Sequence, residues 1–100
     1  MPKGYWLAQI DVKNPDGYKL YVAALQPIFK KYGARYVMRG GRSENLEGEN
    51  RSRTVVIEFE SYDSALACYR SAEYQKAIAL RKAAADADLS VLEGYDGPQP

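Results

Sequence analysis

Residues 5–33 read YWLAQIDVKNPDGYKLYVAALQPIFKKYG, and this stretch decides the fold. Its first eight residues alternate between two faces. Trp6 and Ile10 point to a wholly apolar face, whereas Gln9 and Asp11 point to a mixed one. This alternation predicts a strand over 5–12 that packs beneath helices.

The rest of the stretch predicts a helix. Asn14 is a good N-cap, Pro15 suits the first helical position, and Gly33 suits the end. Pro27 cannot donate to the carbonyl four residues earlier, so we expect a kink or a break there. The apolar stripe recurs about every 3.6 residues and consists of Tyr18, Tyr21, Val22, Leu25, Ile28, Phe29 and Tyr32.

Two further strands follow the helix. Residues 34–39 alternate, and Gly40 and Gly41 interrupt them. A glycine pair in a strand indicates a bulge, or a close approach by a backbone or a ligand. Residues 42–47 can extend this strand, and 53–60 form the third one.

Two serines mark the start of the second helical region and the start of its second piece. Ser61 is a plausible N-cap, and Ser71 can cap a second helical piece. Residues 87–93 predict the last strand, which Gly94 ends. One face of the second piece carries Tyr74, Ala77, Ile78, Arg81 and Ala85.

The resulting order is strand-helix-strand-strand-helix-strand, which predicts an α+β, ferredoxin-like βαββαβ domain with an antiparallel sheet. Both helical regions then cover one face of the sheet, and the other face stays bare. That face is partly apolar, so we expect a second copy to cover it in a homodimer. One domain is expected over 1–95, followed by a disordered tail over 96–100. The apolar residues of the bare face are Leu7, Val37, Val56 and Leu92.

Composition excludes several classes of function. The net charge is +1 and the pI is about 7.8, which argues against nucleic acid as a partner. No apolar run reaches the roughly 18 residues of a membrane span. The start of the chain lacks the apolar core of a signal peptide. With a single cysteine, Cys68, we expect a cytoplasmic protein.

The chain has no histidine. This removes the commonest general base near neutral pH and the commonest metal ligand. Ser-His-Asp and Cys-His nucleophiles are excluded, and a zinc site is not expected. Haem with a proximal histidine is excluded too, although a tyrosine ligand stays open. We therefore expect no metal and no cofactor.

Several short motifs follow one another along residues 4–94. They are Gly4-Tyr5-Trp6, Pro15-x-x-Tyr18-x-x-Tyr21, Arg39-Gly40-Gly41, Leu46-Glu47-Gly48, Ser71-x-Glu73-Tyr74-Gln75-x-Ala77, Arg81 with its alanine run, and Glu93-Gly94. Together they resemble the bacterial family called domain of unknown function 1330 (DUF1330). The resemblance implies a dimeric α/β barrel in which two sheets face each other.

The resemblance implies little about chemistry. Relatives of the fold include small monooxygenases without metal or organic cofactor, haem-degrading enzymes, isomerases and ligand-sensing domains. The haem-degrading branch relies on histidine, so this sequence departs from it. Fold alone does not choose among the others.

Three groups of residues are candidates for a site. Arg39, Gly40 and Gly41 could hold a carboxylate or phosphate, or could form a bulge that bends the strand. The second group is a polar set expected on the bare sheet face. A buried glutamate in it, Glu58 or Glu93, could shuttle a proton, or the set could be an ion-pair network that fixes the dimer. The set consists of Gln9, Asp11, Arg39, Glu58 and Glu93.

The third group is a set of tyrosines at helical spacing, which could wall a pocket or form core. The set consists of Tyr18, Tyr21, Tyr32, Tyr69 and Tyr74. A break near Ser71 could open a gap between helix and sheet, with Arg81 facing inward. Arg81 would then need a carboxylate such as Glu93, or an anionic ligand. The ligand-binding candidates in this group are Tyr21, Tyr69, Tyr74 and Arg81.

These candidates leave three readings of function. The first is a metal-independent enzyme, isomerase-like or monooxygenase-like, that acts on a small anionic or aromatic substrate. The second is a ligand-binding or stress-related dimer without turnover. The third, a structural interaction module without a pocket, has no partner motif in the sequence.

Overall fold

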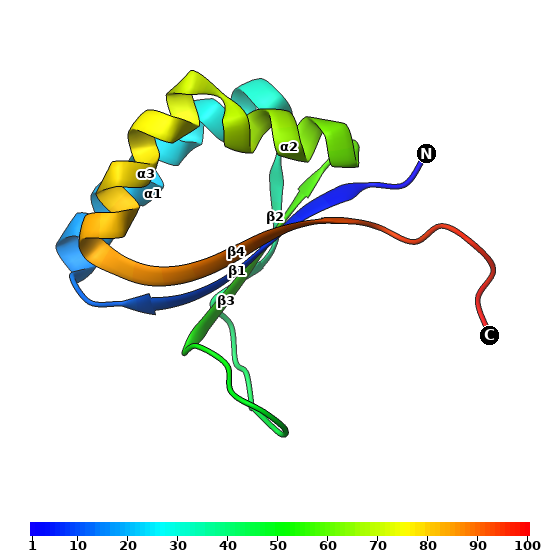
Figure 1. Cartoon of the computed structure of the whole chain (residues 1–100), viewed down its shortest axis with the longest axis horizontal. Coiled ribbons are helices and arrows are strands. Elements are labelled where there is room, and N and C mark those ends of the chain that lie inside the picture. Colours follow the sequence, from blue (N-terminus) through cyan, green and yellow to red (C-terminus); the bar gives the residue numbers. More distant parts are fainter.

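The computed structural model describes residues 1–100. In chain order the elements are β1 (Gly4–Val12), α1 (Pro15–Tyr32), β2 (Arg35–Arg39), β3 (Arg53–Phe59), α2 (Tyr62–Arg70), α3 (Ala72–Ala84) and β4 (Ala85–Glu93). The four strands form one antiparallel sheet in the order β2-β3-β1-β4. All helices lie on one side of this sheet (Figure 1). The expected ferredoxin-like βαββαβ fold is confirmed, with its second helix in two pieces.

Helix α1 has the expected caps. The backbone amide of Gly17 donates to the side chain of Asn14 over 3.1 Å, and Gly33 ends the helix with a left-handed φ of 65°. The expected break at Pro27 is wrong, because α1 is one helix from Pro15 to Tyr32. Ala23 and Pro27 are both exposed, so water can bond the carbonyl that proline leaves without a donor.

Ser71 separates α2 from α3, as the sequence predicts. Its hydroxyl donates to the carbonyl of Cys68 over 2.7 Å and accepts from the backbone amide of Tyr74 over 3.2 Å. One side chain therefore serves the last turn of α2 and the first turn of α3. The change of helix direction here sets how α3 runs over the sheet toward β4.

The core lies between the sheet and the helices. Trp6 on β1 is only 1% exposed, and its Nε1 donates to the carbonyl of Ala65 on α2 over 2.8 Å. Its ring lies 4.8 to 5.9 Å from four other aromatic rings, in the tilted or edge-on geometries that such rings prefer. These rings are Phe29, Phe59, Tyr69 and Tyr74. Trp6 therefore ties β1 to all three helices.

Strand β2 is shorter than expected and contains a bulge. Tyr36 pairs with Ile57 but Met38 pairs with Val56, so Val37 is an extra residue between them. The bulge is thus at Val37 and not at the glycine pair, and the expected extension over 42–47 is wrong. One extra residue reverses the alternation. Arg39 consequently pairs with buried Val55 and faces the helices, which corrects its expected place on the bare face.

Strand β4 begins two residues earlier than expected, at Ala85. It pairs with β1 along its whole length, and Glu93 lies opposite Gly4. Glu93 therefore lies on the same side of the strand as Leu89 and Val91, which face the helices. It is exposed because it lies at the end of the sheet. Its expected place on the bare face is wrong.

The remaining features lie at the margins of the domain. The loop between β2 and β3 projects on the side away from the helices, and the end of the chain after β4 runs out from the sheet (Figure 1). None of the helices combines the length and the apolar character needed to cross a membrane.

Candidate functional site: an arginine–tyrosine cleft

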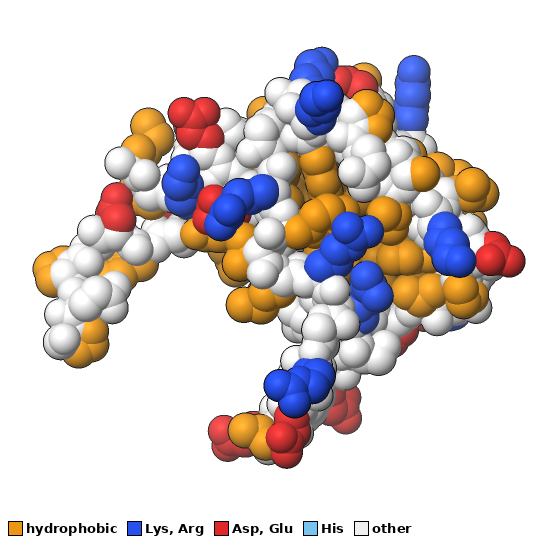
Figure 2. All heavy atoms as spheres, turned by 180° about the vertical axis from the view of Figure 1, so that it is seen from behind, with side chains coloured by type: hydrophobic (Ala, Val, Ile, Leu, Met, Phe, Trp, Pro, Cys, Tyr) orange, Lys and Arg blue, Asp and Glu red, His pale blue; other side chains and the backbone are white.

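A narrow cleft lies between α1 and the helix-facing side of the sheet. We call it the arginine–tyrosine cleft, because its polar lining consists of Tyr18, Tyr21, Tyr36, Arg39 and Arg53 among apolar side chains. Its volume is about 20 Å³, which is room for roughly one water molecule. The face seen in Figure 2 has basic side chains lying over an apolar hollow. No carboxylate lines the cleft.

Arg53 is the innermost of the two arginines. Its guanidinium carbon lies 5.7 Å from the centre of the Tyr18 ring, and its Nε is buried without a hydrogen-bond partner. It takes part in none of the ion pairs of the chain. A guanidinium with a buried, unbonded N–H is a costly arrangement. An anion in the cleft would relieve it.

Arg39 lies over the outer part of the same cleft. Its guanidinium carbon is 4.4 Å from the centre of the Tyr36 ring, a cation–π distance. Arg39 is exposed and also makes no ion pair. Because it sits at the end of an edge strand, it is the lining side chain that can move aside most easily.

The two glycines that follow Arg39 in the sequence differ in how closely they approach Arg53. Gly40 has a φ of 67°, and a Cβ there would lie 2.8 Å from the guanidinium carbon of Arg53. Its amide donates to the carbonyl of Thr54 over 3.0 Å, so it is not free for a ligand. Gly41 has open space around its Cα. The close approach expected at the glycine pair is thus made by the side chain of Arg53.

Tyr21 lines the cleft and contacts Tyr74 on α3. The hydroxyls of Tyr21 and Tyr74 lie 2.9 Å apart and are buried. Burial raises the pKa of Tyr21 far above its ordinary value, and the nearby Tyr74 raises it further. Burial likewise raises the pKa of Tyr18, although the charge of Arg53 opposes this. Burial also raises the pKa of Tyr74, against the hydrogen bond with Tyr21 and the charge of Arg81. All three therefore remain neutral hydroxyls at physiological pH, able to donate a hydrogen bond but unfit as bases.

A family model described as a domain of unknown function, DUF1330, matches residues 3–95. The chain belongs to the DUF1330 family. The match confirms the resemblance seen in the short motifs and brings no activity with it. None of the curated proteins compared with the chain matches it.

Solved structures similar to this DUF1330 chain share its fold at low sequence identity. A protein of unknown function from Rhodopseudomonas palustris is 20% identical, with a TM-score of 0.77 over 96% of this chain and 85% of that one. A dimeric ferredoxin-like protein of unknown function from Thermobifida fusca is 15% identical, with a TM-score of 0.61 over 92% and 91%. SnoaB, a cofactor-independent oxygenase from Streptomyces nogalater, is 10% identical, with a TM-score of 0.62 over 100% and 97%. At these identities the likeness shows the fold alone.

The two glutamates expected as acids or bases lie outside the cleft of this DUF1330 protein. Glu58 is on the bare face, where it accepts from Arg35 over 3.0 Å and from the Tyr5 hydroxyl over 3.3 Å. Glu93 is at the far end of β4 and makes no ion pair. Arg81, in the last turn of α3, lies near the start of β4 instead. At about 3.3 Å per residue along a strand, Glu93 is too far away to be its partner.

Sequence reasoning missed Arg53 and Tyr36 as members of the site, whereas Tyr18 belonged to the predicted group of tyrosines. The sequence did contain a signal for Arg53, because alternate residues of a strand face the same side. Arg53 therefore faces the helices together with Val55 and Ile57. Tyr69, Tyr74 and Arg81 do come together near the junction of α3 with β4, as the break at Ser71 suggested. Arg81 faces inward and is only 6% exposed. Asp11 and Gln9 are on the bare face, as expected.

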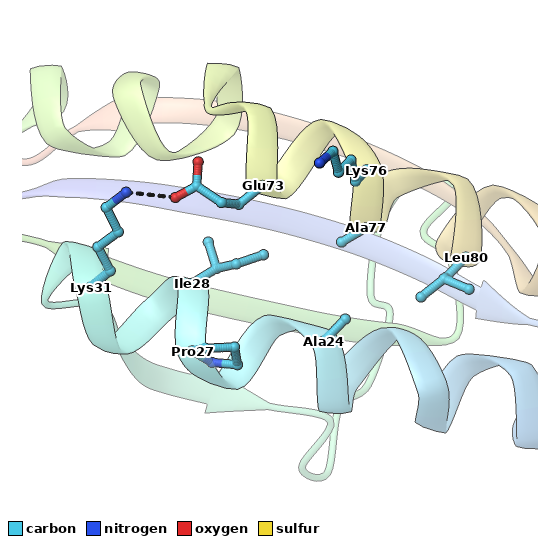
Figure 3. A pocket seen from close by; sticks show the side chains of 8 residues that line it. All are labelled: Ala24, Pro27, Ile28, Lys31, Glu73, Lys76, Ala77 and Leu80. Atoms are coloured by element: carbon cyan, nitrogen blue, oxygen red, sulfur yellow. Dashed lines mark hydrogen bonds and ion pairs between the residues drawn. The ribbon is translucent and has the colours of Figure 1, made fainter.

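A second hollow lies on the outer side of the helices, between α1 and α3 (Figure 3). It has a volume of about 510 Å³ and is lined by small and apolar side chains such as Ala24, Ala77 and Leu80. The ammonium of Lys31 and the carboxylate of Glu73, 2.7 Å apart, pair across one end of it. Lys31 and Glu73 thus largely neutralise each other. No three acidic or cysteine side chains gather anywhere in a way that could hold a metal ion.

Proposed function

We propose that this DUF1330 protein is a homodimer that binds a small anionic, at least partly aromatic molecule in the arginine–tyrosine cleft. One observation carries the proposal: Arg53 has a buried Nε without a partner, in a cleft that no carboxylate lines. A carboxylate or phenolate would give this guanidinium a charged hydrogen bond, which contributes about 1.5–3 kcal/mol.

The lining suits the rest of such a molecule. Tyr18, Tyr21 and Tyr36 offer ring faces and edges, and the other wall is apolar. Because the cleft has a volume of about 20 Å³, a ligand has to displace Arg39 and take its place over Tyr36. The guanidinium of Arg39 can then fold back over the ligand, since it is exposed and free of ion pairs.

The chemistry that this site suits best is stabilisation of an enolate or phenolate. In an apolar cleft a guanidinium attracts negative charge on a substrate oxygen more strongly than it does in water. This would serve an isomerisation or a cofactor-independent oxygenation, in which the substrate itself supplies the electrons. The oxygenase SnoaB, described as cofactor-independent, has the same fold, and this analogy is our reason to name that class.

A binding protein without turnover is the alternative, and one observation favours it. The cleft holds arginines and neutral tyrosines but no carboxylate that could take a proton. A substrate would therefore have to arrive already ionised. Glu58, a candidate acid or base by sequence, then belongs to the dimer contact instead, together with Arg35 and Tyr5.

The homodimer forms through the bare side of the sheet in this proposal. That side exposes Met38 and Leu92, with Leu7 and Val56 half-buried between them. An apolar surface in the middle of a sheet is unfavourable in water. A second copy stacked face to face would cover it, as the dimeric structural neighbour makes plausible.

Native mass spectrometry of the protein purified from its own host tests the proposal directly. We expect twice the chain mass, together with a small bound molecule that is lost on denaturation. If oxygen is then consumed when the recovered compound is added back with the protein, the enzyme reading is supported. Saturable binding without conversion supports the alternative. A monomer with no bound molecule under any condition contradicts both.

A further inference from the structure

A third hollow lies where the last turn of α3 meets β4, and we call it the β4 hollow. It has a volume of about 410 Å³, and its lining includes Arg51, Tyr69, Arg81, Lys82, Asp86 and Leu89. Only Leu89 also lines the arginine–tyrosine cleft. The two spaces are therefore neighbours with separate charged groups.

Arg81 is the unusual residue of this hollow. It is only 6% exposed, the sole charged side chain among the buried residues of the chain. It makes no ion pair, and its Nε has no hydrogen-bond partner. The hydroxyl of Tyr74 lies near enough for the charge of Arg81 to lower the pKa of that tyrosine, but a neutral hydroxyl is not a counter-charge. A buried charge without a counter-charge is strongly disfavoured, so the site calls for an anion.

The other charges around the hollow do not supply that anion. Asp86 is paired with Lys13 over 3.1 Å. Arg51 is paired twice, with Asp11 and with Asp88, each over 3.0 Å. Lys82 is exposed and makes no ion pair. The charges left without a partner are thus those of Arg81 and Lys82, which are both positive.

Beside these charged groups, part of the wall of the hollow is apolar. The Tyr69 ring packs against Tyr74 with 5.2 Å between centroids, and Leu89 and Ala87 continue the surface along β4. Inorganic phosphate would leave this wall uncovered, whereas an organic acid would cover it. We infer that the β4 hollow binds a small organic carboxylate, with its carboxylate on Arg81 and Lys82 and its apolar part along Tyr69 and Leu89. This site is separate from the cleft, so the inference does not rest on the proposed function.

Benzoate is a suitable probe for the test. It is titrated into the full-length protein while the backbone amide signals are followed by NMR. We expect saturable shifts at residues 81–89, and inorganic phosphate should produce none at the same concentration. The substitution Lys82→Ala should weaken this binding at least about fivefold and Arg81→Gln at least about tenfold. Lys76→Ala, on the same helix but outside the hollow, is the matched control.

Arg53→Met separates this inference from the proposed function. Binding at residues 81–89 should survive that substitution, because Arg53 does not line the β4 hollow. If Arg81→Gln fails to fold, Lys82→Ala decides the question alone. Shifts confined to the cleft, equal binding of phosphate, or unchanged affinity in Lys82→Ala would overturn the inference.

Discussion

Gly40 is the residue that leaves room for Arg53. A Cβ at Gly40 would lie 2.8 Å from the guanidinium carbon of Arg53 and 2.9 Å from one of its terminal nitrogens, and the φ of Gly40 is 67°. The backbone at the end of β2 is thus shaped around a cationic side chain that begins on β3. This contact fixes how Arg53 lies over Tyr18 in the cleft.

Substituting Gly40→Ala should therefore both destabilise the fold and displace Arg53. We expect a loss of about 1–3 kcal/mol in the free energy of unfolding, measured in urea, since a left-handed φ is costly for alanine. Two other glycines separate the causes. Gly48 has a φ of 74° with open space around it, and Gly41 has open space without a left-handed φ. Gly41→Ala should change little, Gly48→Ala should show the strain alone, and Gly40→Ala should be the most destabilising. Equal effects at Gly40 and Gly48 would show that the contact with Arg53 is unimportant.

Trp6→Phe should be strongly destabilising. The substitution removes the bond to the Ala65 carbonyl and leaves space among four aromatic rings. Together these should lower the free energy of unfolding by about 2–4 kcal/mol. Because Trp6 is the only tryptophan, unfolding is best followed by circular dichroism. Leu20→Ala, at an exposed position of α1, serves as the control. A loss no larger than that of the control would contradict the central place of Trp6 in the core.

The buried tyrosines make stability depend on pH in the alkaline range. In the unfolded chain they ionise near their ordinary pKa of 10.0, whereas burial raises the pKa of Tyr21 and Tyr74 in the folded protein. Above about pH 10 the unfolded state thus binds fewer protons, so the free energy of unfolding falls as the pH rises. Tyr21→Phe should make this fall less steep, while Tyr95→Phe, at an exposed position, should not. Urea titrations on both sides of pH 10 measure the slopes, and identical slopes in the two variants would refute this assignment.

Placing a charge in the middle of the bare sheet face should separate the proposed dimer. Leu7 lies there between Val56 and Ser90 of the neighbouring strands. Leu7→Arg should yield a folded monomer in size-exclusion chromatography with light scattering, because an unpaired buried charge is costly. Leu20→Arg, on the opposite side of the molecule, should remain a dimer. A dimeric Leu7→Arg variant would mean that copies associate through a different surface.

The sequence predicted most of the fold because its signals are local. Serine caps at Ser61 and Ser71 mark where α2 and α3 begin, and alternation marks the buried faces of β1 and β3. The prediction of a break at Pro27 was wrong because that turn of α1 faces water, which can bond the unpaired carbonyl. A helical pattern alone does not show which turns face water.

The candidate site was harder to predict, because one inserted residue decides it. The bulge at Val37 turns Arg39 from the bare face to the cleft, and the sequence around Val37 carries no mark of it. Glu93 was misplaced because its face depends on its register with Gly4. Arg81 was different: its place on an apolar helical face already indicated burial, and the structure confirms it.

The affinity of the cleft for a phenolate tests the central claim most directly. 4-Nitrophenol, at a pH where it is ionised, is titrated into the unmodified protein, Arg53→Met and Arg70→Met, the last an exposed arginine on α2 that makes no ion pair. We predict saturable binding that Arg53→Met weakens at least about tenfold and Arg70→Met leaves unchanged. Equal affinity in all three proteins would contradict a role for Arg53 in anion binding, and with it the proposed function of the cleft.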